Sequence, residues 1–80
     1  MTDLNSIVIT GKADSNWDEE RSRFWVKCRR KKVSFFCVVI KGKYLSKYCR
    51  ENITKGLQVR VVGSWEEDHI LADHVEVREI

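Results

Sequence analysis

The stretch VSFFCVVIKGKYLSKYCREN, residues 33–52, decides the fold that we expect for this chain. Its first part, Val33 to Ile40, is apolar on both faces of an extended chain, which predicts a buried strand near the centre of a sheet. Its second part, Lys43 to Asn52, has a helical period. The apolar side of that helix would carry Tyr44, Leu45, Tyr48 and Cys49. We therefore expect a central strand followed directly by an amphipathic helix, with both tyrosines in the core.

Two strands are predicted before this stretch. Ile7 to Thr10 is β-branched throughout and is followed by Gly11, which indicates a strand with a bulge or bend at the glycine. Arg23 to Arg29 alternates between apolar and polar residues, as a half-buried strand does. Its inward residues would be Phe24, Val26 and Cys28, and its outward residues Arg23, Trp25, Lys27 and Arg29. The run 30–32, Arg-Lys-Lys, has the length of a hairpin connection.

Two more strands are predicted after the helix. Leu57 to Trp65 alternates, with Trp65 on the same face as its valines, so we expect this tryptophan in the core or in an interface. A short acidic turn, residues 66–68, leads to a last strand from Ile70 to Ile80, whose alternation changes phase near Ala72 to His74 and predicts a bulge there. Three strands, a helix and two strands match the all-β OB-fold, a five-stranded Greek-key barrel. An SH3-like barrel or a simple β-roll is the alternative.

The distribution of charge indicates the kind of partner. Eighty residues suffice for a single domain, residues 1–80, with a net charge of +3. Between Arg21 and Arg60 there are 13 lysines and arginines and one acid, Glu51, whereas the two ends hold eleven acids against Lys12 and Arg78. Such segregation predicts a polyanionic partner, because a merely solvated surface tends to intersperse its charges. A lysine-rich solvated face is the alternative explanation.

Several classes of function find little support in the sequence. There is no run of 18 apolar residues and no signal peptide, so we expect a cytoplasmic protein with no membrane partner. The three cysteines, Cys28, Cys37 and Cys49, are expected to be reduced and mostly buried. No glycine-rich phosphate loop, nucleophile motif or Cys-x-x-Cys pair accompanies His69 and His74. We therefore expect no enzymatic activity, no catalytic residue, no cofactor and no metal site.

Four segments resemble bacterial single-stranded DNA-binding proteins. Residues 4–12 are similar to that family's opening strand, and residues 72–77 to its last strand. Residues 35–43 and 55–63 resemble its central signature, which is an aromatic-led strand, a Gly-Lys helix start and a Lys-Gly-x-x-Val strand ending in glycine. Primosomal replication protein N is similar by the same features. The resemblance implies an OB-fold that binds single-stranded DNA in replication, repair or recombination, as a homodimer or homotetramer, with replication proteins as further partners.

The chain also departs from that family. The hairpin between the last two strands is short and its tip is acidic, whereas the family's hairpin is long and carries basic and aromatic residues. The family's acidic C-terminal tail is missing from these 80 residues. Lys41 stands where the family often has a phenylalanine that contacts DNA. The resemblance therefore implies a smaller footprint on DNA, without recruitment of partners through a tail.

Binding a single strand without sequence preference needs cations for the phosphates and flat aromatic faces for the bases. Trp25 lies among outward cations, and the resemblance assigns a base-stacking role to Phe35, leaving Phe36 to the core. The predicted nucleic-acid-binding residues are Arg23, Trp25, Lys27, Arg29, Arg30, Lys31, Lys32, Phe35, Lys41 and Arg60.

Four alternatives to this assignment remain open. Trp25 would otherwise cover the edge of the sheet, and Trp17 either packs on the barrel or contacts the nucleic acid. The sequence does not distinguish DNA from RNA. A protein-interaction module with the same fold is the competing function.

Overall fold

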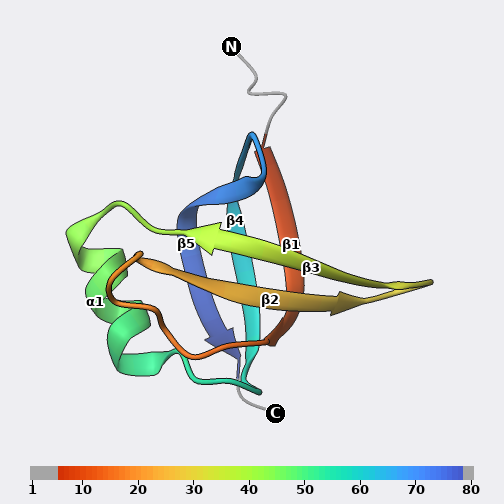
Figure 1. Cartoon of the computed structure of the whole chain (residues 1–80), viewed down its shortest axis with the longest axis horizontal. Coiled ribbons are helices and arrows are strands. Elements are labelled where there is room, and N and C mark those ends of the chain that lie inside the picture. Colours follow the sequence, from red (N-terminus) through yellow and green to blue (C-terminus); the bar gives the residue numbers. More distant parts are fainter. Residues whose placement is uncertain (1–5, 79–80) are drawn as a thin grey trace.

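A computed structural model describes residues 6–78 and confirms the predicted order of elements (Figure 1). The elements are β1 (Ser6–Ala13), β2 (Arg23–Arg29), β3 (Val33–Val39), α1 (Lys43–Asn52), β4 (Gln58–Glu66) and β5 (His69–Arg78). The bounds of α1 coincide with those predicted from the helical period. Leu4 and Asn5 of the predicted opening segment, and Glu79 and Ile80 of the predicted last strand, lie outside the described residues.

The five strands form a closed barrel in the order β1-β2-β3-β5-β4. Neighbouring strands are antiparallel except β3 and β5, which pair in parallel through Val38 with Ile70 and Val39 with Leu71. The helix lies between the third and fourth strands in the chain. A five-stranded Greek-key barrel with this connection is the OB-fold, as predicted.

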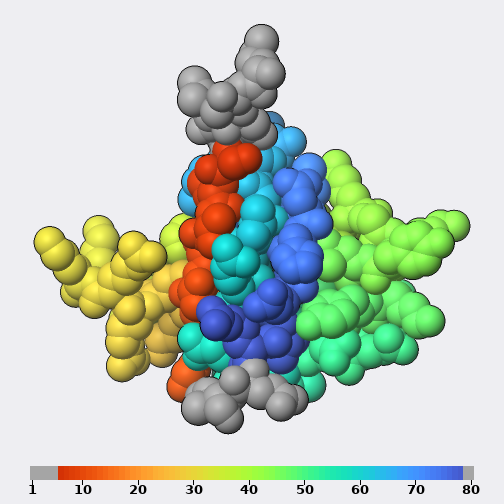
Figure 2. All heavy atoms as spheres, turned by 180° about the vertical axis from the view of Figure 1, so that it is seen from behind, coloured from red at the N-terminus to blue at the C-terminus, as the bar shows by residue number. Residues whose placement is uncertain are grey.

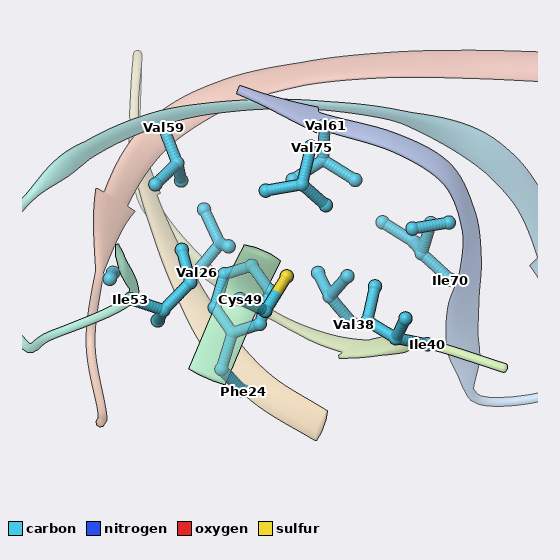
Figure 3. Close-up of a cluster of buried hydrophobic side chains, with 12 residues drawn as sticks. Phe24, Val26, Val38, Ile40, Cys49, Ile53, Val59, Val61, Ile70 and Val75 are labelled. Atoms are coloured by element: carbon cyan, nitrogen blue, oxygen red, sulfur yellow. The ribbon is translucent and has the colours of Figure 1, made fainter. Parts of the chain in front are cut away.

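The core lies inside the barrel and is closed at one end by the helix. Figure 3 shows side chains from β2, β3, β4 and β5 converging with Cys49 of α1. Phe24, Val26, Val59 and Val61 are fully buried, which confirms the predicted inward faces of β2 and β4. Phe36 packs against this core, whereas Phe35 is 55% exposed. The prediction that Phe36 rather than Phe35 faces inward is therefore confirmed.

The hairpin of β2 and β3 reaches beyond the barrel. β2 pairs with β1 only through Lys27 with Lys12 and Val26 with Ala13, so the outer part of the hairpin has no other strand beside it. We call residues 27–35 the arm; it projects to the right in Figure 1. The prediction that β3 is buried on both faces is wrong for this part, because Val33 is 42% exposed.

Two backbone predictions have different outcomes. The bulge predicted in β5 is present: Val62 pairs with His74 but Gly63 pairs with Ala72, which leaves Asp73 as the extra residue. A bulge at Gly11 is absent, because β1 pairs with β4 without a register shift from Ser6 to Lys12. Gly11 instead allows β1 to lie close to β2, because a side chain there would overlap the backbone carbonyl of Lys27.

The helix differs from prediction in one residue. Tyr48 packs against the core, and its hydroxyl accepts a hydrogen bond of 3.0 Å from the backbone N–H of Val77. Tyr44, also predicted to be in the core, is 92% exposed. It lies at the margin of the apolar side, where it lines a shallow groove beside β5 and is not covered by it. Among residues 6–78, no helix has the length and apolar character needed to span a membrane.

Candidate nucleic-acid interface

Trp25 and Phe35 lie on the same outward face of the β2–β3 hairpin. Trp25 pairs with Cys37 and Lys27 pairs with Phe35, so the two aromatic residues are diagonal neighbours across the strands. Trp25 is 39% exposed and Phe35 is 55% exposed. The expectation that a hairpin would bring these rings to one solvent-facing surface is therefore met.

Each ring has its own cation beside it. The guanidinium carbon of Arg23 lies 5.9 Å from the centroid of the Trp25 ring, and Nζ of Lys27 lies 6.0 Å from that of Phe35. Both distances are at the outer limit of a cation–π contact, which contributes only about 0.5–1 kcal/mol at an exposed site. A base that stacks on either ring can displace the cation towards its own phosphate at little cost.

The backbone of Trp25 is held by the loop between β1 and β2. Its N–H donates to the hydroxyl of Ser15 over 3.0 Å, and its carbonyl accepts from the N–H of Asp14 over 2.7 Å. The same loop contributes Asp18, whose carboxylate lies 3.8 Å from Arg23 and 3.5 Å from Arg21. The loop therefore fixes the position of the indole and partly neutralises the cations at the base of the hairpin.

The tip of the arm is strongly basic and open to solvent. All four of its cations are exposed, and no ion pair among residues 6–78 involves any of them; they are Arg29, Arg30, Lys31 and Lys32. Charges of one sign crowded on a two-stranded arm repel one another, and a polyanion relieves that repulsion. Of these predicted cations, Arg29 lines a groove with Lys27 on the aromatic face, whereas Arg30, Lys31 and Lys32 line the groove on the inner side of the arm.

The structure adds Lys12 to this surface. Lys12 of β1 pairs with Lys27 of β2, and the two lysines line a groove of about 370 Å³ together with Arg29 and Gln58. Lys12 belongs to the acidic N-terminal part of the chain, so charge counting along the sequence passed over it. Only the register between β1 and β2 reveals its position.

Two predicted site residues lie away from the arm. Arg60 is half-buried on β4, where it pairs with Thr10 on one side and Glu76 on the other, and β1 separates it from β2. Lys41 is exposed and follows Ile40, whose N–H donates to the carbonyl of Ser22 at the base of the hairpin. The structure therefore places Lys41 at the end of the aromatic face, and Arg60 beside Thr10, which lines the same groove as Lys12 and Lys27.

Trp17 packs on the barrel. Its ring lies 6.4 Å from that of Phe24, and its indole N–H donates to Glu19 over 2.8 Å. Glu19 also accepts two hydrogen bonds from Arg50 of the helix, at 2.6 and 2.7 Å. The hydrogen bonds from Arg50 and Trp17 lower the pKa of Glu19 to about 2. Trp17 therefore helps to join the loop to α1, as the packing alternative predicted.

Trp65 lies at the margin of the core. Its ring is tilted against Phe36 at 5.6 Å between centroids, and it is 39% exposed. It lines an open groove of about 680 Å³ between the inner side of the arm and β1. The groove carries Ile7, Val8 and Ile9 on one wall and the basic tip of the arm on the other. Trp65 therefore faces the groove on the inner side of the arm, and not the outer face that carries Trp25.

The acidic turn between β4 and β5 borders the aromatic face. Burial raises the pKa of the Cys37 thiol, Arg23 lowers it and Asp68 raises it further, because both charges lie close to this thiol. Burial also raises the pKa of Cys28, and that of Cys49 to about 12. All three cysteines are free thiols, and their raised pKa values are typical of unreactive cysteines.

Solved structures with this architecture include two crystal structures of the mitochondrial single-stranded DNA-binding protein of S. cerevisiae. They have TM-scores of 0.84 and 0.79, 13% identity, and coverage of 95% of this chain and 96% of theirs. The small single-stranded DNA-binding protein of Streptomyces coelicolor has a TM-score of 0.75 and 17% identity, over 98% of this chain and 96% of its own.

No family model and no curated protein matches the sequence. Within residues 6–78, no group of three or more candidate ligands is placed to hold a metal ion. At 13–17% identity the similarity establishes the fold. The chain has the OB-fold barrel that these single-stranded DNA-binding proteins also have.

Proposed function

We propose that the chain binds single-stranded DNA through the outer face of the β2–β3 hairpin, with no catalytic step. This proposal is based on Trp25 and Phe35, two exposed rings that are diagonal neighbours on one face. Each ring has a cation about 6 Å from its centroid. Successive bases would stack on the two rings, and each stacked base contributes about 1–3 kcal/mol. Arm cations and Lys12 would hold the phosphates.

Such binding is independent of the base sequence. Every base has a π-face, and the cations contact phosphates that are the same in any sequence. The solved structures with this fold belong to proteins named for binding single-stranded DNA, which supports DNA as the ligand. Single-stranded RNA is the alternative that stacking and charge do not exclude. The proposed setting is DNA replication, repair or recombination, in agreement with the resemblance in sequence.

The test is a titration of tryptophan fluorescence with oligo(dT) at low and high salt. We expect saturable quenching whose log Kd changes with log salt concentration by about 0.7 per phosphate contacted. A Trp25→Phe variant should retain most of the affinity and lose most of the quenching, whereas the matched Trp65→Phe variant should retain the quenching. Absence of quenching and of binding at low salt would overturn the proposal. Tighter binding of oligo(rU) than of oligo(dT) would assign the surface to RNA.

We also propose that the chain self-associates through β1. One edge of β1 pairs with β4, but from Ile7 to Ile9 no described strand lies beside its other edge. That edge opens onto the apolar groove beneath the arm, and Val8 is 51% exposed. An unpaired apolar edge strand is a template for pairing with another strand. A solution mass above that of one chain, reduced to one chain by Val8→Lys, would support this; a monomeric mass for the unchanged chain would contradict it.

A further inference from the structure

The first turn of α1 presents an aromatic ring to solvent beside three lysines. Among residues 6–78, Tyr44 is the most exposed of the large hydrophobic residues, at 92%. Single exposed apolar residues are common on protein surfaces, so exposure alone carries no meaning. The residues near Tyr44 are what make its exposure significant. Lys41 and Lys43 precede it by three residues and one, and Lys47 lies one turn further along the same helix.

These lysines are available to an external anion. All three are exposed, and no ion pair among the described residues involves them. Arg50, on the other flank of α1, is by contrast occupied by Glu19. The first turn of the helix contains no acidic residue. The beginning of α1 therefore combines uncompensated positive charge with an open aromatic face.

This cluster is continuous with the interface on the hairpin. β3 runs from the tip of the arm towards the start of α1, and Arg23 pairs with Val39 two residues before Lys41. In Figure 2, side chains of the arm and those around the start of α1 project at opposite ends of the molecule. The longest dimension of the protein is 34 Å. A strand bound on Phe35 and Trp25 would pass Lys41 before it reached Tyr44, which lies beside β5.

Tyr44 also lines a shallow groove of about 400 Å³ between α1 and β5, with Leu45, Tyr48 and Val75. The carboxylate in this groove, Glu76, lies 3.9 Å from both His74 and Arg78. Arg78 partly balances the negative charge of this carboxylate. The apolar walls suit the flat face of a base.

We propose that Tyr44, Lys41, Lys43 and Lys47 form a second contact for the single strand, in which a base stacks on Tyr44 and its phosphates lie against the lysines. This inference rests on the proposed function and extends the footprint from the hairpin to the helix. It requires that affinity depend on whether the oligonucleotide is long enough to reach α1.

The experiment compares Tyr44→Ala with the unchanged chain over a length series of oligo(dT), from about 4 to about 16 nucleotides, the range of site sizes of OB-folds. The ratio of the two Kd values should be near one for the shortest oligonucleotide and rise to about five or more for the longest. Tyr44→Phe, which keeps the ring, should restore the affinity for the longest. Because Tyr44 is almost fully exposed, none of these variants should alter thermal unfolding.

Two lysine variants, one at the proposed contact and one away from it, supply the matched control. Lys47→Gln should lower the salt dependence of binding to the longest oligonucleotide by about 0.7, the value of one phosphate contact. Lys55→Gln, which removes an equally exposed lysine just beyond the other end of the helix, should leave it unchanged. Equal Kd ratios at all lengths, with the unchanged chain binding normally, would overturn the second contact alone. Failure of the unchanged chain to bind at any length would overturn it together with the proposed function.

Discussion

Replacing Phe35 by alanine separates base stacking from phosphate binding. Phe35 is 55% exposed and lies outside the core, so its removal should leave the fold intact. Stacking of a base on the ring contributes about 1–3 kcal/mol. The base displaces the ammonium of Lys27 from its position 6.0 Å from the ring centroid, which costs up to about 1 kcal/mol. With about 2 kcal/mol for stacking and about 0.5–1 kcal/mol for displacing the ammonium, the net loss is about 1–1.5 kcal/mol, or a Kd about 5- to 13-fold higher.

The salt dependence of the Kd distinguishes the role of Phe35 from that of Lys27. Phe35→Ala removes no phosphate contact, so it should weaken binding by the same factor at every salt concentration. Lys27→Gln should reduce the slope of log Kd against log salt by about 0.7 and should lose its effect at high salt. Fluorescence anisotropy of labelled oligo(dT) over a salt series measures both quantities.

Val33→Ala is the matched control, because Val33 lies two residues from Phe35 on the same face of β3 and is 42% exposed. It removes apolar surface without removing a ring, and we expect its Kd to change by less than about two-fold. Equal losses for Val33→Ala and Phe35→Ala would mean that apolar contact, not stacking, binds the ligand. An unchanged Kd for Phe35→Ala would refute the assignment of the ring.

Three further predictions concern stability and charge. Glu19, with its pKa lowered to about 2, should stabilise the fold fully above its ordinary pKa near 4.5, and this contribution should disappear as the pH falls towards 2. Glu19→Gln should accordingly lower the melting temperature at pH 7 but not at pH 2; equal effects at both pH values would contradict this. Gly63→Ala should destabilise by about 1–3 kcal/mol, because the new methyl group would overlap the carbonyl of Leu71, whereas Gly42→Ala, in open space, should cost less in chemical denaturation. Asp68→Asn should lower the Kd for oligo(dT) about two-fold at low salt, because a unit charge at about 10 Å in water contributes about 0.4 kcal/mol. An unchanged Kd would show that the acidic turn does not face the ligand.

The order of elements was predictable because alternation and helical period are local properties of the sequence. Lys43 to Asn52 was predicted with its observed bounds, and the phase change near His74 correctly indicated the bulge in β5. The exposure of Val33 was not predictable in this way. An apolar strand is buried only along the part that other strands cover, and β5 covers β3 only near Val38 and Val39.

The candidate site was predictable to the extent that it lies within one hairpin. A three-residue connection fixes which residues of two antiparallel strands share a face, so Trp25 and Phe35 could be placed together from the sequence. Lys12 and Arg60 depend on which strand closes the barrel beside which, and this information is not local. Lys12 consequently joined the site without having been predicted, and Arg60 lies on β4, separated from the hairpin by β1.

The separation of the arm from the core has a consequence for evolution of the binding surface. The buried residues that hold the barrel lie on the inward faces of the strands, and neither Trp25 nor Phe35 is among them. We therefore expect substitutions on the outer face of the arm to change the affinity for the proposed ligand at little cost in stability, and core substitutions to leave a cavity and destabilise the fold. The same barrel is maintained at 13–17% identity in the solved structures. Because so few positions are shared, the ligand that we propose depends on the exposed rings and cations of this chain, which in our proposal form one path from the arm to α1.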